Sequence, residues 1–389
     1  MNKTKIIFIL MAFIAAGSLF TFCSSEKKQG TVLHLSYTIN FKGDSITNKL
    51  DGLKWALSYL GAELKDSSFY RNCIPQKDNS IRVCFDSIGF SERALTVLKE
   101  LTDSLKKSKE YQTKQSIDIG EFIALTIGTS KHYYAITNVF PTYGEFKAKY
   151  FTGNEKQFAV VASSVTHNNR KLLLHTDTMA LKSAFVAEEG TGSLDSNTFK
   201  TELFEVFDVM SNGQLRFAVY NKEGELVDGS PSESGQAGKP AKCIWCHELF
   251  IQPLFKKTPD VSGYVSEQEF TAIVKSQMEI INAYRKQLKG AVDFSKTQEH
   301  TQMELLYISY MEPSIKKLSQ EWGIKEQELS VILKYNQVHS FTEFPFLGEL
   351  YHRSDLKKYT PFDINIPQSI RETSTNEPLF IKSIKTAGR

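Results

Sequence analysis

The chain has 389 residues, of which 41% are hydrophobic and 23% are charged, and both fractions are ordinary for a globular protein. Its net charge of +3 is too small to predict binding to nucleic acid. The length is sufficient for two domains, and no internal repeat is evident.

The N-terminal segment has the pattern of an export signal. Lys3 and Lys5 precede an almost wholly apolar run at 6–22, and the chain becomes polar directly after Cys23. A short basic start followed by an apolar run is typical of a secretory signal peptide, which we expect at 1–22. An uncleaved anchor is the alternative, although the run is at the lower length limit for a membrane-spanning helix. Cys23 occupies the place of the lipidated cysteine in bacterial lipoproteins, although a phenylalanine precedes it where such signals prefer a small residue.

Residues 23–236 are expected to form an α+β domain with an antiparallel sheet. Apolar residues recur at helical spacing in 46–64 and 91–107, and Ser91 is placed to cap the second helix. Alternating and β-branched residues between turn residues predict strands. The expected strands are 31–40, 80–85, 122–127, 132–137, 145–151, 157–165, 171–176 and 181–186.

The clearest hairpin is predicted at 203–220. Its two arms flank Asn212-Gly213, a dipeptide that favours a two-residue type I′ turn. Successive strands joined by short turns favour an antiparallel sheet. We find no catalytic signature in this part of the chain.

The strongest motif is Cys243-Ile244-Trp245-Cys246-His247. Two cysteines three positions apart, followed directly by a histidine, form the attachment motif of c-type haem. Each thiol adds to one vinyl group of the porphyrin, and the histidine is then placed to bind the iron. We therefore expect one covalent haem c on Cys243 and Cys246, with His247 as proximal ligand and Trp245 beside the porphyrin.

Other interpretations of the cysteines stay open. A structural zinc site needs four ligands, and Cys73 and Cys84 are not paired at CxxC spacing. A thioredoxin-like pair would follow a strand in a βαβ unit, whereas a Ser-, Gly- and Pro-rich stretch precedes this motif. Cys73 and Cys84 are 11 positions apart, which suits a disulfide in an exported protein, and two buried thiols are the alternative.

Residues 237–389 are expected to form a mainly α-helical domain, with the boundary in the linker 230–240. Beyond the short helix that begins at Cys243, helical spacing and caps predict four further helices. These are 266–289, 297–311, 313–322 and 325–335. The proline-containing tail from Phe341 is expected to be irregular.

A helical unit that opens with CxxCH resembles the c-type cytochromes. The resemblance rests on Cys243, Cys246 and His247 and covers at most about the last 150 residues. In that family the other face of the haem usually receives a methionine and sometimes a histidine. The resemblance implies Met311 as the sixth ligand, because Glu312-Pro313 predicts an extended step after it. His339, in a predicted loop, is the alternative sixth ligand.

These features predict an exported protein that transfers single electrons in the cell envelope, in the periplasm or held at a membrane by lipid on Cys23. Its partners would be redox proteins of the envelope. We favour an electron carrier over a catalytic oxidoreductase. A haem-dependent oxidoreductase or sensor, with its ligand site in the N-terminal domain, is the second interpretation. A surface-tethered binding protein with a structural CxxCH is the third.

Overall fold

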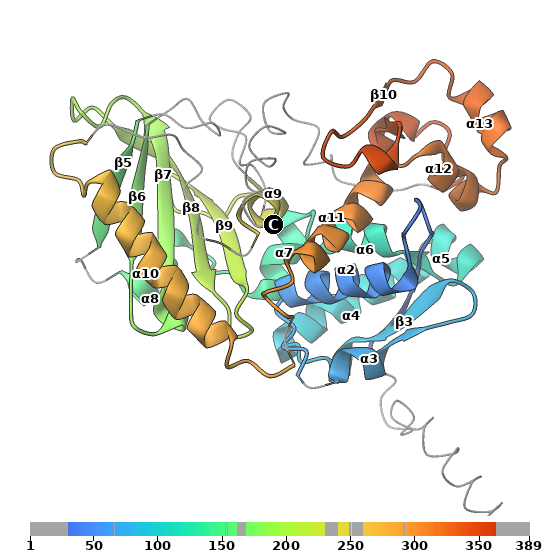
Figure 1. Cartoon of the computed structure of the whole chain (residues 1–389), viewed down its shortest axis with the longest axis horizontal. Coiled ribbons are helices and arrows are strands. Elements are labelled where there is room, and N and C mark those ends of the chain that lie inside the picture. Colours follow the sequence, from blue (N-terminus) through green and yellow to red (C-terminus); the bar gives the residue numbers. More distant parts are fainter. Residues whose placement is uncertain are drawn as a thin grey trace, which may run out of the picture.

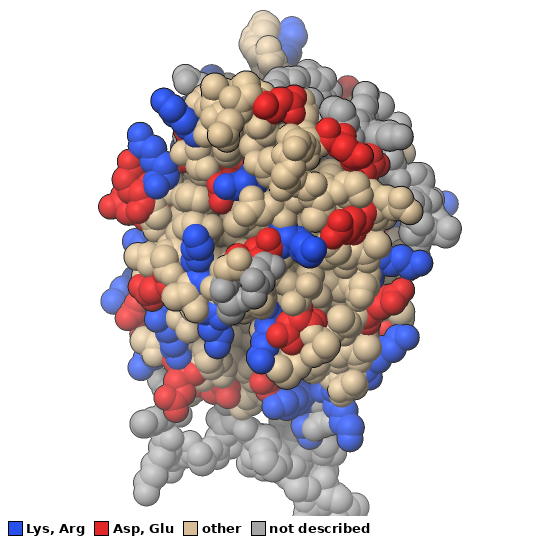
Figure 2. All heavy atoms as spheres, turned by 90° about the vertical axis from the view of Figure 1, so that its left-hand side faces the viewer, with Lys and Arg blue, Asp and Glu red and all other residues tan. Residues whose placement is uncertain are grey.

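The protein combines a five-stranded antiparallel sheet with a helical part and a smaller mixed sheet, so the predicted α+β class is confirmed (Figure 1). The computed structural model describes residues 30–65, 67–151, 153, 155–161, 169–229, 240–248, 250, 260–290 and 292–362. Within this part, no helix is both long enough and apolar enough to cross a membrane. On the face drawn in Figure 2, basic and acidic side chains are interspersed, so this face offers no field of a single sign.

The large sheet follows chain order, and every neighbouring pair of its strands is antiparallel. Its strands are β5 (Lys156–Val160), β6 (Arg170–His175), β7 (Ala184–Thr191), β8 (Lys200–Val209) and β9 (Leu215–Asn221). Helix α8 (Tyr143–Tyr150) covers one face, where Tyr143 stacks on Phe204. Helix α10 (Glu267–Arg285) lies across the other face, where Phe270 stacks on Phe158 (Figure 1). The sheet is therefore buried between helices on both sides.

The predicted hairpin is confirmed as β8 and β9, but its turn is not the expected type I′. That turn needs positive φ at both central residues, and only Gly213, with φ of +83°, has it. The Gly213 amide donates to the Met210 carbonyl (2.9 Å), which closes a longer turn. Asn212 instead uses its side chain, whose amide donates to the carbonyls of Ser58 and Ala62 at 2.7 and 2.9 Å. A tertiary contact therefore decides the turn.

A second sheet lies beneath the helical part in Figure 1. It has the strand order β2-β3-β1-β4, in which only the pairing of β1 with β4 is parallel. Its strands are β1 (Val32–Ser36), β2 (Cys73–Pro75), β3 (Ser80–Cys84) and β4 (Ile117–Asp118). The strands predicted at 31–40 and 80–85 are therefore confirmed in their central residues.

Three predicted strands are wrong, because 122–127, 132–137 and 145–151 are helical. They fall in α6 (Ile119–Thr126), α7 (Ser130–Thr137) and α8. Helix α6 is buried on nearly all sides, so its sequence is apolar without the 3.6-residue period that marks a surface helix. The Asp118 side chain caps it by accepting from the Gly120 amide (2.8 Å).

Helix α11 (Thr297–Met311) is the centre of the helical part and packs against α2 (Ile46–Tyr59) and α6. A Cβ atom added at Gly52 of α2 would lie 2.8 Å from the Gln302 carbonyl oxygen. One added at Gly120 of α6 would lie 2.4 Å from the Leu306 carbonyl oxygen. The helix crossings are thus close enough to require glycine on both partners.

The helices predicted at 91–107, 313–322 and 325–335 are confirmed in position as α4 (Glu92–Lys107), α12 (Ile315–Trp322) and α13 (Glu326–Ile332), whereas α3 (Ser68–Asn72) and α5 (Lys109–Lys114) were not predicted. Helix α4 begins after the Ser91 cap, and α12 ends at Gly323, which has the left-handed φ of +68°. The other elements are α9 (Pro240–His247), β10 (Val338–His339) and β11 (Leu350–Tyr351). Among the residues that the structure describes, 3₁₀ turns span Phe85–Ser87, Ala180–Lys182, Pro345–Leu347 and Arg353–Leu356.

Described residues on both sides of the boundary predicted at 236/237 belong to the same hydrophobic core. One hydrophobic core extends from Leu33 in β1 through Ile244 and Trp245 in α9 to Met311 in α11. Helices α9, α10 and α11 therefore pack into the layers formed by the preceding chain. Helices α12 and α13, at the upper right of Figure 1, share a small hydrophobic cluster outside this core, and Leu350 of β11 packs in another with Leu305 and Ile308 of α11.

Candidate functional site

Helix α9 presents the cysteines and the histidine of the CxxCH motif on one side. Cys243, Cys246 and His247 are half-buried, whereas Ile244 and Trp245 between them are buried. Positions separated by three and four residues lie on the same face of a helix. The Tyr59 hydroxyl of α2 donates to the carbonyl of the residue after His247 (2.6 Å), which fixes the end of the helix. The structure thus brings the three predicted haem-binding residues together on one face.

His247 lies over aromatic side chains of the large sheet. The centre of its ring is 5.5 Å from that of Phe207 and 5.7 Å from that of Phe217. Burial among these atoms lowers the pKa of His247 to about 4, with a smaller effect of Arg170 in the same direction. Its Nδ1 lies 3.4 Å from the Phe250 carbonyl oxygen. A neutral imidazole whose Nδ1–H points at a backbone carbonyl keeps Nε2 available for a metal.

Cys243 lies near a group of buried charges. Burial raises the pKa of the Cys243 thiol well above its usual value, and Glu205 and Cys246 raise it further. Arg170 of β6 is paired with Glu189 of β7 and lies 3.5 Å from a carboxylate oxygen of Glu205 in β8. Redox-active cysteine pairs work through a thiolate of lowered pKa. The Cys243 thiol has the opposite property, which disfavours a thioredoxin-like role.

Trp245 points away from the cysteine and histidine face. It is 3% exposed, and its ring lies 5.6 Å from Tyr307 and 6.3 Å from His300, both in α11. A residue two positions after Cys243 is turned by about 200° around the helix. Trp245 therefore anchors α9 to the core through α11, and its expected place beside the porphyrin stays a prediction.

The two predicted sixth ligands are not brought to His247. Met311 is the last residue of α11, as the sequence predicted, but its side chain is 2% exposed and lies in the core. Helix α11 lies on the Trp245 side of α9, opposite to the side of His247. His339 belongs to β10 and places its Nε2 2.7 Å from an Oε atom of Glu312. Neither residue has a described contact with His247.

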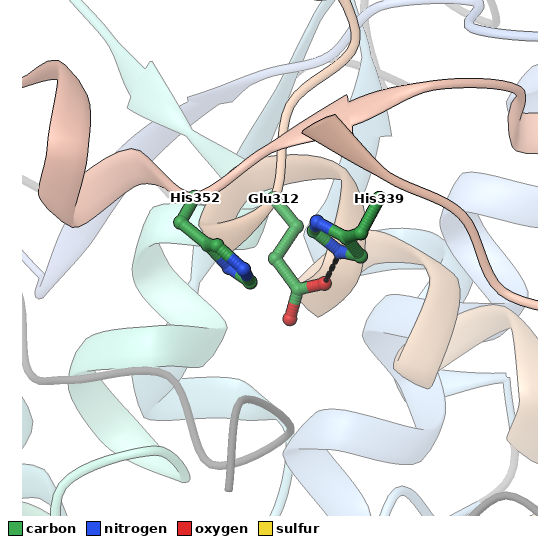
Figure 3. A group of neighbouring side chains, drawn as sticks. All are labelled: Glu312, His339 and His352. Carbon is green, nitrogen blue, oxygen red and sulfur yellow. Dashed lines mark hydrogen bonds and ion pairs between the residues drawn. The ribbon is translucent and has the colours of Figure 1, made fainter. Parts of the chain in front are cut away.

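The side chains of Glu312, His339 and His352 converge at the end of α11 (Figure 3). One possible ligand atom from each lies within 4.8 Å of those of the other two. The two imidazole rings are parallel, with centres 4.2 Å apart. Sequence reasoning missed this group, because its members are 27 and 13 positions apart and no motif joins them. In the described part of the chain, no other His, Cys, Asp and Glu side chains form so compact a set.

The other predicted sites have different outcomes. Cys23 lies outside the described residues. Cys73 and Cys84 are buried on the neighbouring strands β2 and β3, and within the described residues no disulfide joins them. Cys73 is paired in register with Val83, one residue before Cys84, so their side chains leave the sheet on opposite faces. Burial raises the pKa of the Cys73 thiol, as expected for a buried cysteine.

Comparison of the chain with known proteins gives no further guide to this site. No protein-family model, no curated protein and no solved structure matches it.

Proposed function

We propose that the chain is a c-type cytochrome-like protein that carries one covalent haem and transfers electrons in the cell envelope. Cys243 and Cys246 would form the two thioethers, and His247 would be the proximal iron ligand. The observation that carries this proposal is the common face of these three side chains on α9, at the spacing i, i+3 and i+4.

The surroundings of the motif suit a haem. Phe185, Phe207 and Phe217 supply an aromatic surface beside His247, with Phe185 stacked on Phe207 at 4.8 Å. Such a surface excludes water, and exclusion of water raises the reduction potential of a haem. The Phe250 carbonyl would orient the His247 ring through Nδ1. When bound, the haem supplies the one-electron chemistry, and these residues bind, orient and shield it.

The proposal places the protein outside the cytoplasm, on the N-terminal pattern of 1–22 and Cys23. Lipid on Cys23 would hold it at a membrane. Its electron donors and acceptors would then be redox proteins of the envelope.

Haem attachment is the decisive test. The full chain, exported from cells that attach c-type haem, should gain the mass of one haem and give the pyridine haemochrome spectrum of a thioether-linked porphyrin. Cys243→Ser and Cys246→Ser should each lose one of the two thioethers, and His247→Ala should change the iron spectrum. Cys73→Ser is the matched control and should keep full haem content. A mature chain without added mass, or one that contains zinc instead of iron, would refute the proposal.

A haem-dependent sensor or oxidoreductase is the second candidate, and one observation favours it over a plain carrier. Neither Met311 nor His339, the expected sixth ligands, lies on the His247 side of α9 among the described residues. An iron without a sixth protein ligand binds small molecules readily. Rapid binding of carbon monoxide by the ferrous protein would support this candidate, and no binding would support the carrier.

A further inference from the structure

We infer that Glu312, His339 and His352 form a binding site for a divalent transition-metal ion, separate from the CxxCH motif. The three side chains come from different segments and meet at one point (Figure 3). Two imidazoles and one carboxylate are a common ligand set for zinc and for non-haem iron. The inference does not depend on the proposed haem, because it uses none of the residues of α9.

Backbone hydrogen bonds hold the three ligands in place. Strand β10 pairs His339 with Leu350 of β11, and His352 lies two residues after Leu350, so His339 and His352 point to the same face of the pair as diagonal neighbours. The Tyr351 amide donates to the Pro313 carbonyl (3.0 Å), and this bond ties β11 to the residue that follows Glu312. The ligand positions are therefore fixed by secondary structure and not by flexible side chains alone.

His352 is held further by its neighbour Arg353. This guanidinium is 1% exposed and donates two hydrogen bonds to the Glu321 carboxylate, at 3.0 and 2.9 Å. It also donates to the Tyr310 carbonyl, two residues before Glu312. The anchored guanidinium thus connects the His352 backbone to the same end of α11.

The ligand atoms are close to the separation that a metal requires. Zinc–ligand distances near 2.0–2.1 Å place tetrahedral ligand atoms about 3.3 Å apart, and here they lie within 4.8 Å. Glu312 and His339 already approach to 2.7 Å. Rotation of the two stacked rings toward the carboxylate would bring the set to bonding distance. The ion would take the place of the proton between Glu312 and His339.

A plain histidine–glutamate ion pair explains only part of this arrangement. It does not explain why a second imidazole lies parallel to the first at 4.2 Å. Glu312 is buried, whereas both histidines are half-buried. A bound ion would therefore have one open side, where water or a small ligand completes the coordination.

The test is Co²⁺ and Zn²⁺ binding by the full chain, measured by calorimetry and by the visible spectrum of the cobalt form. We expect one ion per chain and no thiolate-to-cobalt charge-transfer band, because no cysteine belongs to this site. Loss of a ligand should exceed the 10–100-fold effect of second-shell changes, so His339→Ala, His352→Ala and Glu312→Gln should each weaken binding by more than about 100-fold. Glu312→Gln keeps the shape of the side chain and so tests the ligand rather than the fold.

His175→Ala is the matched control, since His175 is a half-buried histidine of β6 outside the group. It should bind the metal like the wild type. The inference is overturned if the wild type binds no ion, or if binding persists in all three ligand variants. A cobalt spectrum with a thiolate band that disappears in Cys243→Ser would assign the ion to the CxxCH motif instead. The first two outcomes leave the haem proposal untouched, whereas a thiolate band from Cys243 would count against the haem as well.

Discussion

Replacing Gly120 by alanine should destabilise the protein, against the usual effect of this substitution in a helix. The new Cβ would lie 2.4 Å from the Leu306 carbonyl oxygen and 2.5 Å from the Tyr310 Cβ, whereas ordinary contact begins at 3.4 Å. Helices α6 and α11 would have to separate by about 1 Å. Overpacking of this kind costs about 1–3 kcal/mol. Because both contacted atoms belong to the main framework of α11, we expect a value of about 2 kcal/mol or more.

Urea unfolding followed by circular dichroism measures this cost as a lower transition midpoint with an unchanged m-value. Gly144→Ala in α8 is the control, because the nearest atom to its new Cβ is the Thr142 hydroxyl oxygen at 3.8 Å. Because the added Cβ meets no close atom there, the main effect is the higher helix propensity of alanine over glycine, which should raise the free energy of unfolding by up to about 1 kcal/mol. If Gly120→Ala were as stable as Gly144→Ala, the close crossing of α6 and α11 would be wrong.

Two further predictions concern Trp245 and Glu121. Trp245→Ala should cost about 3–5 kcal/mol, because the side chain fills the core between α9 and α11. Trp245→Phe should cost less, because the buried indole N–H has no partner among the described residues, and it should keep full haem content. Loss of haem from a stable Trp245→Phe protein would contradict the orientation of α9. Burial, then Glu110 and Asp118, raises the pKa of Glu121 to about 8. The native state then holds a proton that the unfolded state releases above about pH 4.5, so this residue makes stability fall with rising pH, by up to about 1.4 kcal/mol per unit, until about pH 8. Glu121→Gln has no such proton to lose, so the difference in free energy of unfolding between variant and wild type, measured with urea, should shift in favour of the variant from about pH 4.5 to about pH 8. A difference that stays constant over this pH range would refute the raised pKa of Glu121.

The fold could be predicted where local signals and tertiary contacts agree. Ser91 caps α4 as expected, with its side chain accepting a hydrogen bond from the Ala94 amide (3.2 Å). One face of that helix is exposed and polar, so the apolar residues of the buried face recur at helical spacing and can be recognised in the sequence. The β8–β9 hairpin was also predictable, because its arms are long and flank a glycine. Its turn type was not, because Asn212 bonds to α2, and a contact so distant in the chain has no local signal.

The buried helices α6 and α7 show why the rest was missed. Helix α6 is enclosed on nearly all sides and needs no polar face, so its sequence resembles that of a buried strand, and α7 exposes only a narrow stripe at Lys131, His132 and Ala135. In α6 even Glu121 is buried, and the aromatic and β-branched residues of both helices favour strands in isolation. Contact with α11, almost 200 positions later, selects the helix.

In the candidate site, too, the residues of a local motif could be predicted and those that depend on tertiary structure could not. The CxxCH motif is local, so spacing alone placed Cys243, Cys246 and His247 on one face. A sixth ligand depends on tertiary structure, and the extended step after Met311 predicted the end of α11 without predicting that Met311 is buried. His339 was chosen as a loop histidine able to bind a metal. Because His339 lies beside Glu312 and His352, it is still placed to bind a metal, but that metal would be a separate divalent ion and not the haem iron.

Helix α9 makes the two proposed sites independent. Its motif face lies toward Phe207 and Phe217 in the sheet, while its Trp245 face packs on α11, whose end carries Glu312. A change at Glu312 would have to pass through α11 and then through Trp245 of α9 or Tyr59 of α2 to reach His247. Closely packed helices resist such displacement, so metal binding at Glu312 should leave the haem spectrum unchanged. A spectral shift on adding Zn²⁺ to the haem protein, lost in Glu312→Gln, would show instead that α11 and α9 move together.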